Sequence, residues 1–209
     1  MRELFLVRHG ESEHHVKGFT GGWTNSSLTD LGRKQANLTA HRLRSIISAQ
    51  SIAFYSSDLN RAVETAQIIG SILGIIPLPE KRLRELNWGI AVDMPLEEAK
   101  KLELEKTEPL MDWVPFPEAE SRRLLYNRIS AILAEINANE DGTVLIVSHG
   151  NAMEESIFWW LDFPVNLRSS ISFDIDPCSI TRLRVNEWGE RTIALLNSSD
   201  HLLSIASDI

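Results

Sequence analysis

The sequence predicts an α/β fold: a three-layer α/β/α sandwich with a mostly parallel central sheet and a small irregular cap. Short apolar runs typical of buried strands alternate with amphipathic segments, which is the order of a parallel sheet covered by helices on both faces. No linker, low-complexity tract or repeat interrupts this order. At 209 residues the chain can bury one sizeable core. We therefore expect one domain over residues 1–209, with 78–117 as a cap or active-site wall.

The first half of the chain contains two strand–helix pairs. Leu4–Val7 is a continuous apolar run typical of a strand buried on both faces. The next helix is expected from Thr29, or Asp30 as its cap, to about Ser48, because apolar residues recur on one side. Ile52–Tyr55 is a second strand. A clear helix then runs over Asp58–Leu73, with Asp58 as its expected N-cap and a glycine as its stop.

The second half begins with an irregular stretch. Residues 78–117 contain five prolines, which interrupt regular structure, and only Leu96–Glu105 has a helical pattern. Two helices and three strands are expected after it: helices Glu118–Asn137 and Asn151–Leu161, and strands Thr143–Val147, Ile180–Val185 and Thr192–Leu196. The last two strands flank the turn-like Glu187-Trp188-Gly189, which predicts an antiparallel hairpin.

Composition and charge narrow the functional classes. The net charge is −8 and the chain has no basic run or stripe, which argues against nucleic-acid binding. No apolar run approaches the length of a membrane span, and the N-terminus has no signal-peptide pattern. The single cysteine, Cys178, cannot form an internal disulfide. We therefore expect a cytoplasmic protein with no membrane partner, in which any anion site is a local cluster of arginines.

Two apolar strands end on the same dipeptide. "FLVRHG" covers Phe5–Gly10, and "LIVSHG" covers Leu145–Gly150. In open α/β sheets, ligands bind beyond the carboxyl ends of the strands. If these two strands are neighbours, His9 and His149 meet at the same sheet edge, each followed by a glycine that permits close approach of a ligand. A lone histidine after a strand is more often structural than catalytic, but two in the same frame favour a site.

A third candidate lies in "YSSDLNRAVETA", Tyr55 to Ala66. Arg61 falls in the first turn of the expected helix, where the helix dipole favours anions and disfavours a cation. One interpretation is a solvated surface arginine. The other is a guanidinium that binds an anion together with free backbone N–H groups, and the mismatch with the dipole favours this second interpretation.

Taken in order, these segments resemble the histidine phosphatase superfamily, in its phosphoglycerate mutase-like branch. The resemblance covers nearly the whole chain and depends on an ordered set with these separations, since "RHG" alone is a weak signal. The matching segments are "LVRHGES", "GGWTNSSLTDLGRKQA" (Gly21–Ala36), "YSSDLNRAVETA", "LRELNWG" (Leu83–Gly89) and "IVSHG".

The resemblance implies a mechanism. His9 would attack phosphorus and become a phosphohistidine, which water then hydrolyses. Arg8, Arg61 and His149 would hold the phosphoryl oxygens and stabilise the charge of the transition state. Cationic neighbours also lower the pKa of a nucleophilic imidazole and keep it neutral. Because arginines supply the charge, we expect neither a metal nor a cofactor.

The proton for the leaving oxygen is expected from the segment after the second strand–helix pair. Glu85 matches the position of the acid in the family, and it would protonate the leaving oxygen. Without the resemblance, a surface glutamate in the charged stretch Glu80–Glu85 is an equally good interpretation. "NWGIAVDMP" lacks the glutamate that many members carry in the turn after this acid, so Asp93 is the reserve candidate.

The chain departs from the family pattern around the expected phosphate pocket. His15 stands where many members have an asparagine, and we expect it to contact phosphate in its place. The pair His14-His15 suggests a metal site at first sight, but adjacent histidines do not point together and no carboxylate or cysteine pattern supports one. Gly21 precedes Gly22-Trp23 where the mutases have serine or threonine, and we expect both glycines to line the pocket.

Phosphatase and mutase share the phosphohistidine and differ in whether water or a bound phosphoglycerate accepts the phosphoryl group. Mutases hold that small, doubly charged acid with extra cations after the catalytic acid. Here Leu86–Glu120 has three lysines, no arginine and nine acids, and "SRR" at Ser121–Arg123 falls in the following helix, so it is not counted. We therefore expect a metal-independent phosphatase that hydrolyses a small-molecule phosphomonoester. Phosphoglycerate mutase is the alternative, and a non-catalytic phosphate-binding module or a metal-dependent hydrolase is a weaker one.

The sequence leaves the substrate and the oligomeric state open. No residue pattern selects one phosphorylated small molecule. The aromatic segment Ile157–Phe163 fits either a homodimer contact or packing against the sheet, and packing is the simpler interpretation. The C-terminal "NSSDHLL" resembles a family tail near the site, which suggests that His201 approaches the pocket.

Overall fold

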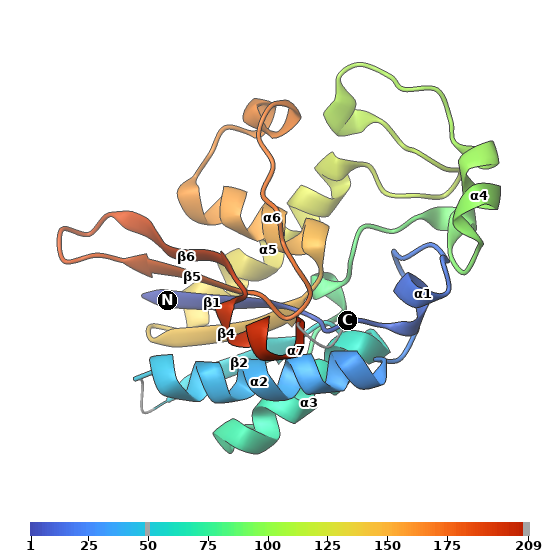
Figure 1. Cartoon of the computed structure of the whole chain (residues 1–209). Coiled ribbons are helices and arrows are strands. Elements are labelled where there is room, and N and C mark those ends of the chain that lie inside the picture. The colour runs from blue at the N-terminus through green and yellow to red at the C-terminus, as the bar shows by residue number, and fades with distance from the viewer. Residues whose placement is uncertain (49–50, 207–209) are drawn as a thin grey trace.

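The computed structural model describes residues 1–48 and 51–206. Its centre is a six-stranded sheet in the order β3-β2-β4-β1-β5-β6 (Figure 1). The four strands from β3 to β1 are parallel, and β5 and β6 add an antiparallel hairpin at one edge. The strands are β1 Glu3–Arg8, β2 Ile52–Ser56, β3 Leu78–Pro79, β4 Thr143–Ser148, β5 Ile180–Val185 and β6 Arg191–Ser198. The predicted mostly parallel sheet is confirmed.

Helices cover both faces of this sheet, as predicted. Helices α2 and α3 lie on one face, and α5 and α6 lie on the other (Figure 1). Alternate residues of β1 point to opposite faces: Leu4 and Leu6 belong to the core under α5 and α6, whereas Phe5 and Val7 belong to the core over α2 and α3. This explains why the strand reads as an unbroken apolar run. The helices are α1 Glu13–Val16, α2 Asp30–Ile46, α3 Asn60–Leu73, α4 Leu96–Ala99, α5 Arg122–Asn139, α6 Gly150–Leu161 and α7 Leu203–Ala206.

The boundaries of α2 and α3 show which of the predicted helix-capping residues are correct. Thr29 caps α2, since its hydroxyl accepts a hydrogen bond from Gly32 N at 3.0 Å. Helix α3 ends at Gly74, which adopts a left-handed conformation with a φ of 74°. The prediction of Asp58 as the N-cap of α3 is wrong, because the N-cap is Leu59.

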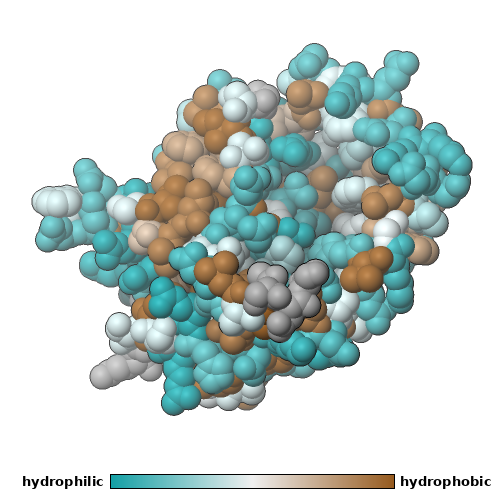
Figure 2. All heavy atoms as spheres, viewed as in Figure 1, coloured by the Kyte–Doolittle hydropathy of each residue, from teal (hydrophilic) through white to brown (hydrophobic). Residues whose placement is uncertain are grey.

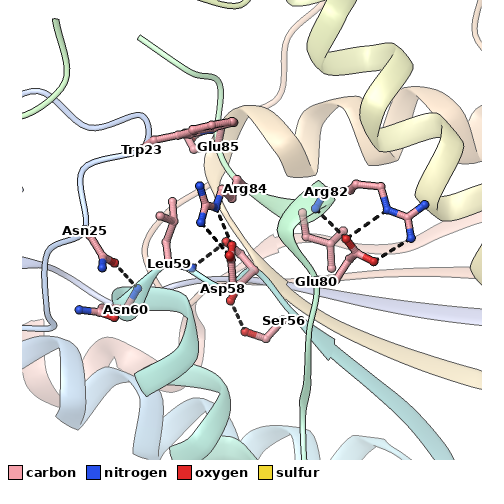
Figure 3. Close-up of polar contacts among 12 residues, drawn as sticks. Trp23, Asn25, Ser56, Asp58, Leu59, Asn60, Glu80, Arg82, Arg84 and Glu85 are labelled. Carbon is pink, nitrogen blue, oxygen red and sulfur yellow. Dashed lines mark hydrogen bonds and ion pairs between the residues drawn. The ribbon is translucent and has the colours of Figure 1, made fainter. Parts of the chain in front are cut away.

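The carboxylate of Asp58 instead binds Arg84, with Nε and Nη2 donating at 2.6 and 2.7 Å (Figure 3). The Arg84 guanidinium lies 4.9 Å from the ring centroid of Trp23. A residue outside the helix accepts a hydrogen bond from the N-terminus of α3 instead of Asp58: Asn60 N donates to Asn25 Oδ1 at 2.8 Å (Figure 3).

Residues 80–117 form the irregular cap, at the side of the molecule where Figure 1 shows α4. The predicted start at residue 78 is wrong, because Leu78 and Pro79 form the edge strand β3. The expected helix of the cap is shorter than Leu96–Glu105: α4 ends at Ala99 and one 3-10 turn, Lys100–Leu102, follows. A small cluster of Ala91, Ala99 and Phe116 holds the cap together. The remaining residues run without long regular elements, as five prolines in forty residues predict.

Helix α5 begins later than its expected start at Glu118, because Ser121 caps it by accepting from Leu124 N at 3.3 Å. The aromatic segment of α6 packs into the core, where Ile157, Phe158 and Trp160 are all buried. Figure 2 shows further apolar residues gathered over α6 and the adjoining base of the β5–β6 hairpin. Across residues 1–48 and 51–206, no helix combines the length and the apolar character needed to cross a membrane.

Candidate active site

The carboxyl ends of β1 and β4 bring the two strand-ending histidines together. Arg8 pairs with Ser148 in the parallel register, and His9 N donates to Ser148 O at 3.0 Å. The rings of His9 and His149 then meet edge to face, with centroids 5.0 Å apart. A pocket of about 320 Å³ opens beside them. It is lined by Arg8, His9, His14, His15, Phe19, Gly21, Gly22, Arg61, Glu85, Trp88, Leu96 and Asn151.

The hydrogen bonds of His9 fix its tautomer. Nδ1 lies 2.7 Å from the carbonyl oxygen of Gly10, and because a carbonyl can only accept, Nδ1 carries the proton. Nε2 therefore has the free lone pair, and it accepts a hydrogen bond from Arg61 Nε at 3.1 Å. Gly10 is needed at this bend, since a Cβ there would lie 2.6 Å from the carbonyl oxygen of Gly32. The backbone thus aims Nε2 of a neutral imidazole at Arg61.

Arg61 is buried in the first turn of α3, with only 1% of its surface exposed. Its guanidinium is held on three sides: Nε donates to His9, Nη2 donates to Gly22 O at 2.8 Å, and Nη1 donates to Thr24 O. Burial lowers the pKa of Arg61 to about 10, so it remains a cation at neutral pH. The loop that contains the two expected pocket glycines therefore fixes the arginine from the opposite wall.

Arg8 is the second cation of the pocket. Its Nη1 donates to the carbonyl oxygen of Ile175 at 2.5 Å, and its Nη2 lies 3.4 Å from His15 Nε2. Burial lowers the pKa of Arg8, and the nearby carboxylate of Glu85 partly offsets this effect. The buried Nε of Arg8 has no hydrogen-bond partner among the described residues.

The four imidazoles around these two arginines are neutral. Burial, followed by the charges of Arg8 and Arg61, holds the pKa of His9 and of His149 well below the ordinary range. Burial likewise lowers the pKa of His14 to about 3. The residue His15 is exposed as a whole, but partial loss of water around its ring, together with the charge of Arg8, lowers its pKa to about 4. The positive charge of the pocket therefore comes from its two arginines, within a chain whose net charge is −8.

The two strand-ending histidines and the two arginines lie together in a chain that matches a known family over nearly its whole length. A profile of the histidine phosphatase superfamily (branch 1) matches residues 4–199. The chain belongs to the histidine phosphatase superfamily. One relative is a probable phosphoglycerate mutase GpmB from Yersinia enterocolitica, which is 32% identical over 192 residues that cover 90% of this chain and 86% of the relative.

Solved structures of histidine phosphatase type share the fold. A mycobacterial glucosyl-3-phosphoglycerate phosphatase is 25% identical, with a TM-score of 0.78 over 95% of this chain and 99% of that one. A phosphoserine phosphatase from Entamoeba histolytica, solved in complex with 3-phosphoglyceric acid, is 27% identical, with a TM-score of 0.77 over 97% of this chain and 100% of that one. The similar proteins thus include phosphatases and a probable mutase.

Glu85 lines the pocket with Arg8 and His9. Two backbone amides hold its carboxylate: Leu86 N donates to Oε1 at 2.8 Å, and Asn151 N donates to Oε2 at 3.3 Å. The reserve acid, Asp93, is exposed and lines a different cavity on the far side of His14. The structure therefore brings Glu85, and not Asp93, into the pocket that both arginines line.

The other histidines predicted for the site differ in how deeply they are buried. His149 is fully buried behind His9, where its Nε2 is 2.8 Å from Ser57 Oγ and its Nδ1 has no partner among the described residues. His15 is exposed at the mouth of the pocket. His201 is absent from the pocket lining: its Nε2 lies 2.9 Å from Thr39 Oγ1 and 3.2 Å from Cys178 O, so the expectation that it approaches the pocket is wrong.

His14 lies between two hydroxyls, with Nδ1 3.0 Å from Ser12 Oγ and 2.8 Å from Ser26 Oγ. In the part of the chain that the structure describes, no group of three His, Cys, Asp or Glu side chains is arranged to hold a metal ion.

The structure also adds residues that sequence reasoning missed. Asn151 follows the second His-Gly and lines the pocket from the start of α6. Ser57 supports His149. Position next to "IVSHG" was a usable signal for Asn151. The place of Ser57 depends on contacts between segments far apart in the sequence.

Proposed function

We propose that this chain is a metal-independent phosphatase that hydrolyses a small-molecule phosphomonoester through a phosphohistidine on His9. The observation that carries the proposal is the orientation of the His9 imidazole. Its Nδ1 proton is bound by Gly10 O at 2.7 Å, so the lone pair of Nε2 faces the guanidinium of Arg61. A neutral nucleophile beside two cations is what phosphoryl transfer needs, since the reaction depends mainly on positioning and charge.

The phosphoryl group binds between Arg8 and Arg61. Arg61 Nε then donates to a phosphoryl oxygen instead of His9 Nε2, which frees the lone pair for attack. Its other two nitrogens keep their bonds to Gly22 O and Thr24 O, so the guanidinium stays in place. Gly21 and Gly22 line the phosphate site, where a Cβ would press against His14 Nε2 at 3.2 Å and Trp88 Cδ1 at 2.9 Å respectively.

His15 and His149 complete the phosphate site. Ser12 N donates to His15 Nδ1 at 3.4 Å, so His15 Nε2 carries the proton. That N–H and the Nη2 of Arg8 are then two donors 3.4 Å apart, and a phosphoryl oxygen supplies the acceptor that both need. The buried Nδ1 of His149 gains a partner in the same way, because a buried polar atom without a hydrogen bond is costly.

Glu85 is the general acid and then the general base. His9 Nε2 forms a bond to phosphorus as the ester P–O bond breaks, and Glu85 donates a proton to the leaving oxygen. Water then attacks the phosphohistidine, the N–P bond breaks, and Glu85 accepts the proton of that water. The step returns His9 to its neutral form and releases inorganic phosphate.

The cap supports hydrolysis over mutase chemistry. Two of its three lysines are already paired on the surface, Lys100 with Glu97 at 2.6 Å and Lys101 with Glu98 at 2.7 Å. The third, Lys106, lies 5.6 Å from the ring centroid of Trp113. Phosphoglycerate mutase remains the second candidate because of the 32% identity to a protein described as a probable mutase.

Two assays run side by side test the proposal. The first measures phosphate release from a panel of phosphomonoesters in EDTA. The second measures conversion of 3-phosphoglycerate to 2-phosphoglycerate with 2,3-bisphosphoglycerate present. We expect release that EDTA does not change and little isomerisation. Efficient isomerisation with little release would establish the mutase, tight phosphate binding without turnover would establish a binding module, and loss of activity in EDTA would contradict metal independence.

We propose a cytoplasmic enzyme, because its single cysteine, Cys178, has no second cysteine with which to form an internal disulfide. A homodimer stays a prediction, which light scattering of the purified protein tests.

A further inference from the structure

Two further cavities adjoin the proposed phosphate pocket, and they have two lining residues in common. The first, of about 310 Å³, has mainly apolar walls that include Trp88, Trp113 and Phe116, and it shares Trp88 and Asn151 with the phosphate pocket. The second, of about 360 Å³, shares Glu85 and Asn151 with it. Arg122 lines both of these outer cavities. It therefore stands beside the path that a leaving group must follow away from the phosphate.

Arg122 has no carboxylate partner within the described chain, unlike its neighbours on α5. Arg123 binds Asp112 through Nε at 2.5 Å and Nη2 at 3.1 Å. Arg128 binds Glu120 through Nη2 at 2.7 Å. Arg122 is also the first residue of α5, where the helix dipole disfavours a cation. Neither an ion pair nor the helix accounts for an arginine at this position.

Two of the carboxyl groups that line a cavity with Arg122 are already bound to other groups. Glu154 accepts from Arg168 Nη2 at 2.5 Å and from Phe173 N at 2.8 Å. Glu85 accepts from two backbone amides. Glu154 and Asp174 line the same cavity as Arg122, together with Arg8, which the proposed mechanism uses for the phosphoryl group. Arg122 is therefore the cation of this cavity that remains for the leaving group, and repulsion from these carboxylates favours a group with one negative charge over a second dianion.

We propose that Arg122 determines substrate specificity by binding a carboxylate on the leaving group, whose apolar body lies against Trp88, Trp113 and Phe116. The inference rests on the proposed phosphatase function and extends it to the substrate class, a phosphate ester of an apolar or aromatic alcohol that carries one carboxylate. A planar guanidinium suits a carboxylate because it can donate two parallel hydrogen bonds. Arg122 takes no part in the chemical step, so it acts on binding of the leaving group.

A pair of isosteric substrates tests this assignment. They are 4-(carboxymethyl)phenyl phosphate and its neutral amide, 4-(carbamoylmethyl)phenyl phosphate, which differ in one charge. For the wild-type protein we expect kcat/KM to favour the carboxylate by roughly ten-fold to a hundred-fold, the worth of a charge-assisted hydrogen bond. Arg122→Gln should remove this preference, mainly through KM, and leave hydrolysis of the amide unchanged. Arg122→Lys should retain part of it.

Arg123→Gln is the matched control, because Arg123 is one residue away and already bound to Asp112. It should keep the full preference, and melting curves of all variants check that they are folded. A wild-type protein without the preference, or Arg122→Gln with the preference intact, overturns the assignment of Arg122. Failure of the wild-type protein to release phosphate from either ester instead overturns the phosphatase function on which the assignment rests.

Discussion

Gly22 and Gly18 form a natural pair for testing how the pocket is built. Both lie in the loop after α1, and both have left-handed backbones, with φ of 60° and 67°. They differ in their surroundings. A Cβ on Gly22 would lie 2.9 Å from Trp88 Cδ1 and 3.0 Å from Leu86 O, whereas a Cβ on Gly18 would meet nothing within 4 Å. Only Gly22 also accepts a hydrogen bond from Arg61.

These contacts set the expected cost of an alanine at each position. The left-handed backbone costs a non-glycine residue about 1–2 kcal/mol, and this applies to both. Gly22→Ala must in addition displace the Trp88 ring or the backbone at Leu86, which adds about 1–3 kcal/mol for overpacking. We therefore expect Gly18→Ala to lower the free energy of unfolding by about 1–2 kcal/mol and Gly22→Ala by about 2–5 kcal/mol.

Urea denaturation and initial rates of phosphate release measure the two effects. Gly22→Ala moves the carbonyl that holds Arg61, and a shift of about 1 Å in a catalytic group can cost about 100-fold in rate. We expect a loss of that order in kcat/KM for Gly22→Ala and none for Gly18→Ala. Equal stability and equal activity of the two variants would refute the idea that the loop backbone positions Arg61.

Three further predictions concern single side chains. Arg61→Lys should lower kcat by roughly 10²–10³-fold, since one ammonium cannot replace three directed N–H donors, and near wild-type phosphate release would contradict this. Burial raises the pKa of Glu155 to about 7, above its unfolded value of about 4.3. Between these two pH values the folded state binds more protons than the unfolded state, so the free energy of unfolding falls as the pH rises. Glu155→Gln should remove that part of the pH dependence, on the order of 3 kcal/mol. A urea midpoint that changes by the same amount between pH 5 and pH 8 in the wild-type protein and in Glu155→Gln would argue against it. Burial raises the pKa of Cys178 to about 12, so a thiol reagent should label the protein only as fast as it unfolds, and rapid labelling of the native protein would contradict this.

The fold and the centre of the site were predictable because their signals are local. A strand buried on both faces must be apolar at every position, and "LFLV" and "TVLIV" meet that condition. Parallel neighbours end at the same edge, so the repeated His-Gly already implied that His9 and His149 meet. Helix caps such as Thr29 follow from side chains within one turn.

The errors concern residues whose partners are distant in sequence. Asp58 has the composition of an N-cap, but Arg84, 26 residues later, binds its carboxylate. Cations for the leaving group were sought only in the cap, and the structure shows that Arg122, at the start of α5, also lines the outer cavities. Sequence spacing could not show which of Arg122 and Arg123 forms an ion pair. Asp112 reaches Arg123 only because of the irregular path of the cap.

The most direct measurement is a rapid-quench search for a phosphorylated residue during turnover of 4-nitrophenyl phosphate. Quenching in base preserves a phosphoramidate, and peptide mapping then locates it. We predict an acid-labile phosphate on Nε2 of His9 and none in a folded His9→Ala variant, which should also release no phosphate. Phosphate trapped on another residue, or steady turnover by His9→Ala, would contradict the assignment of His9 as the nucleophile.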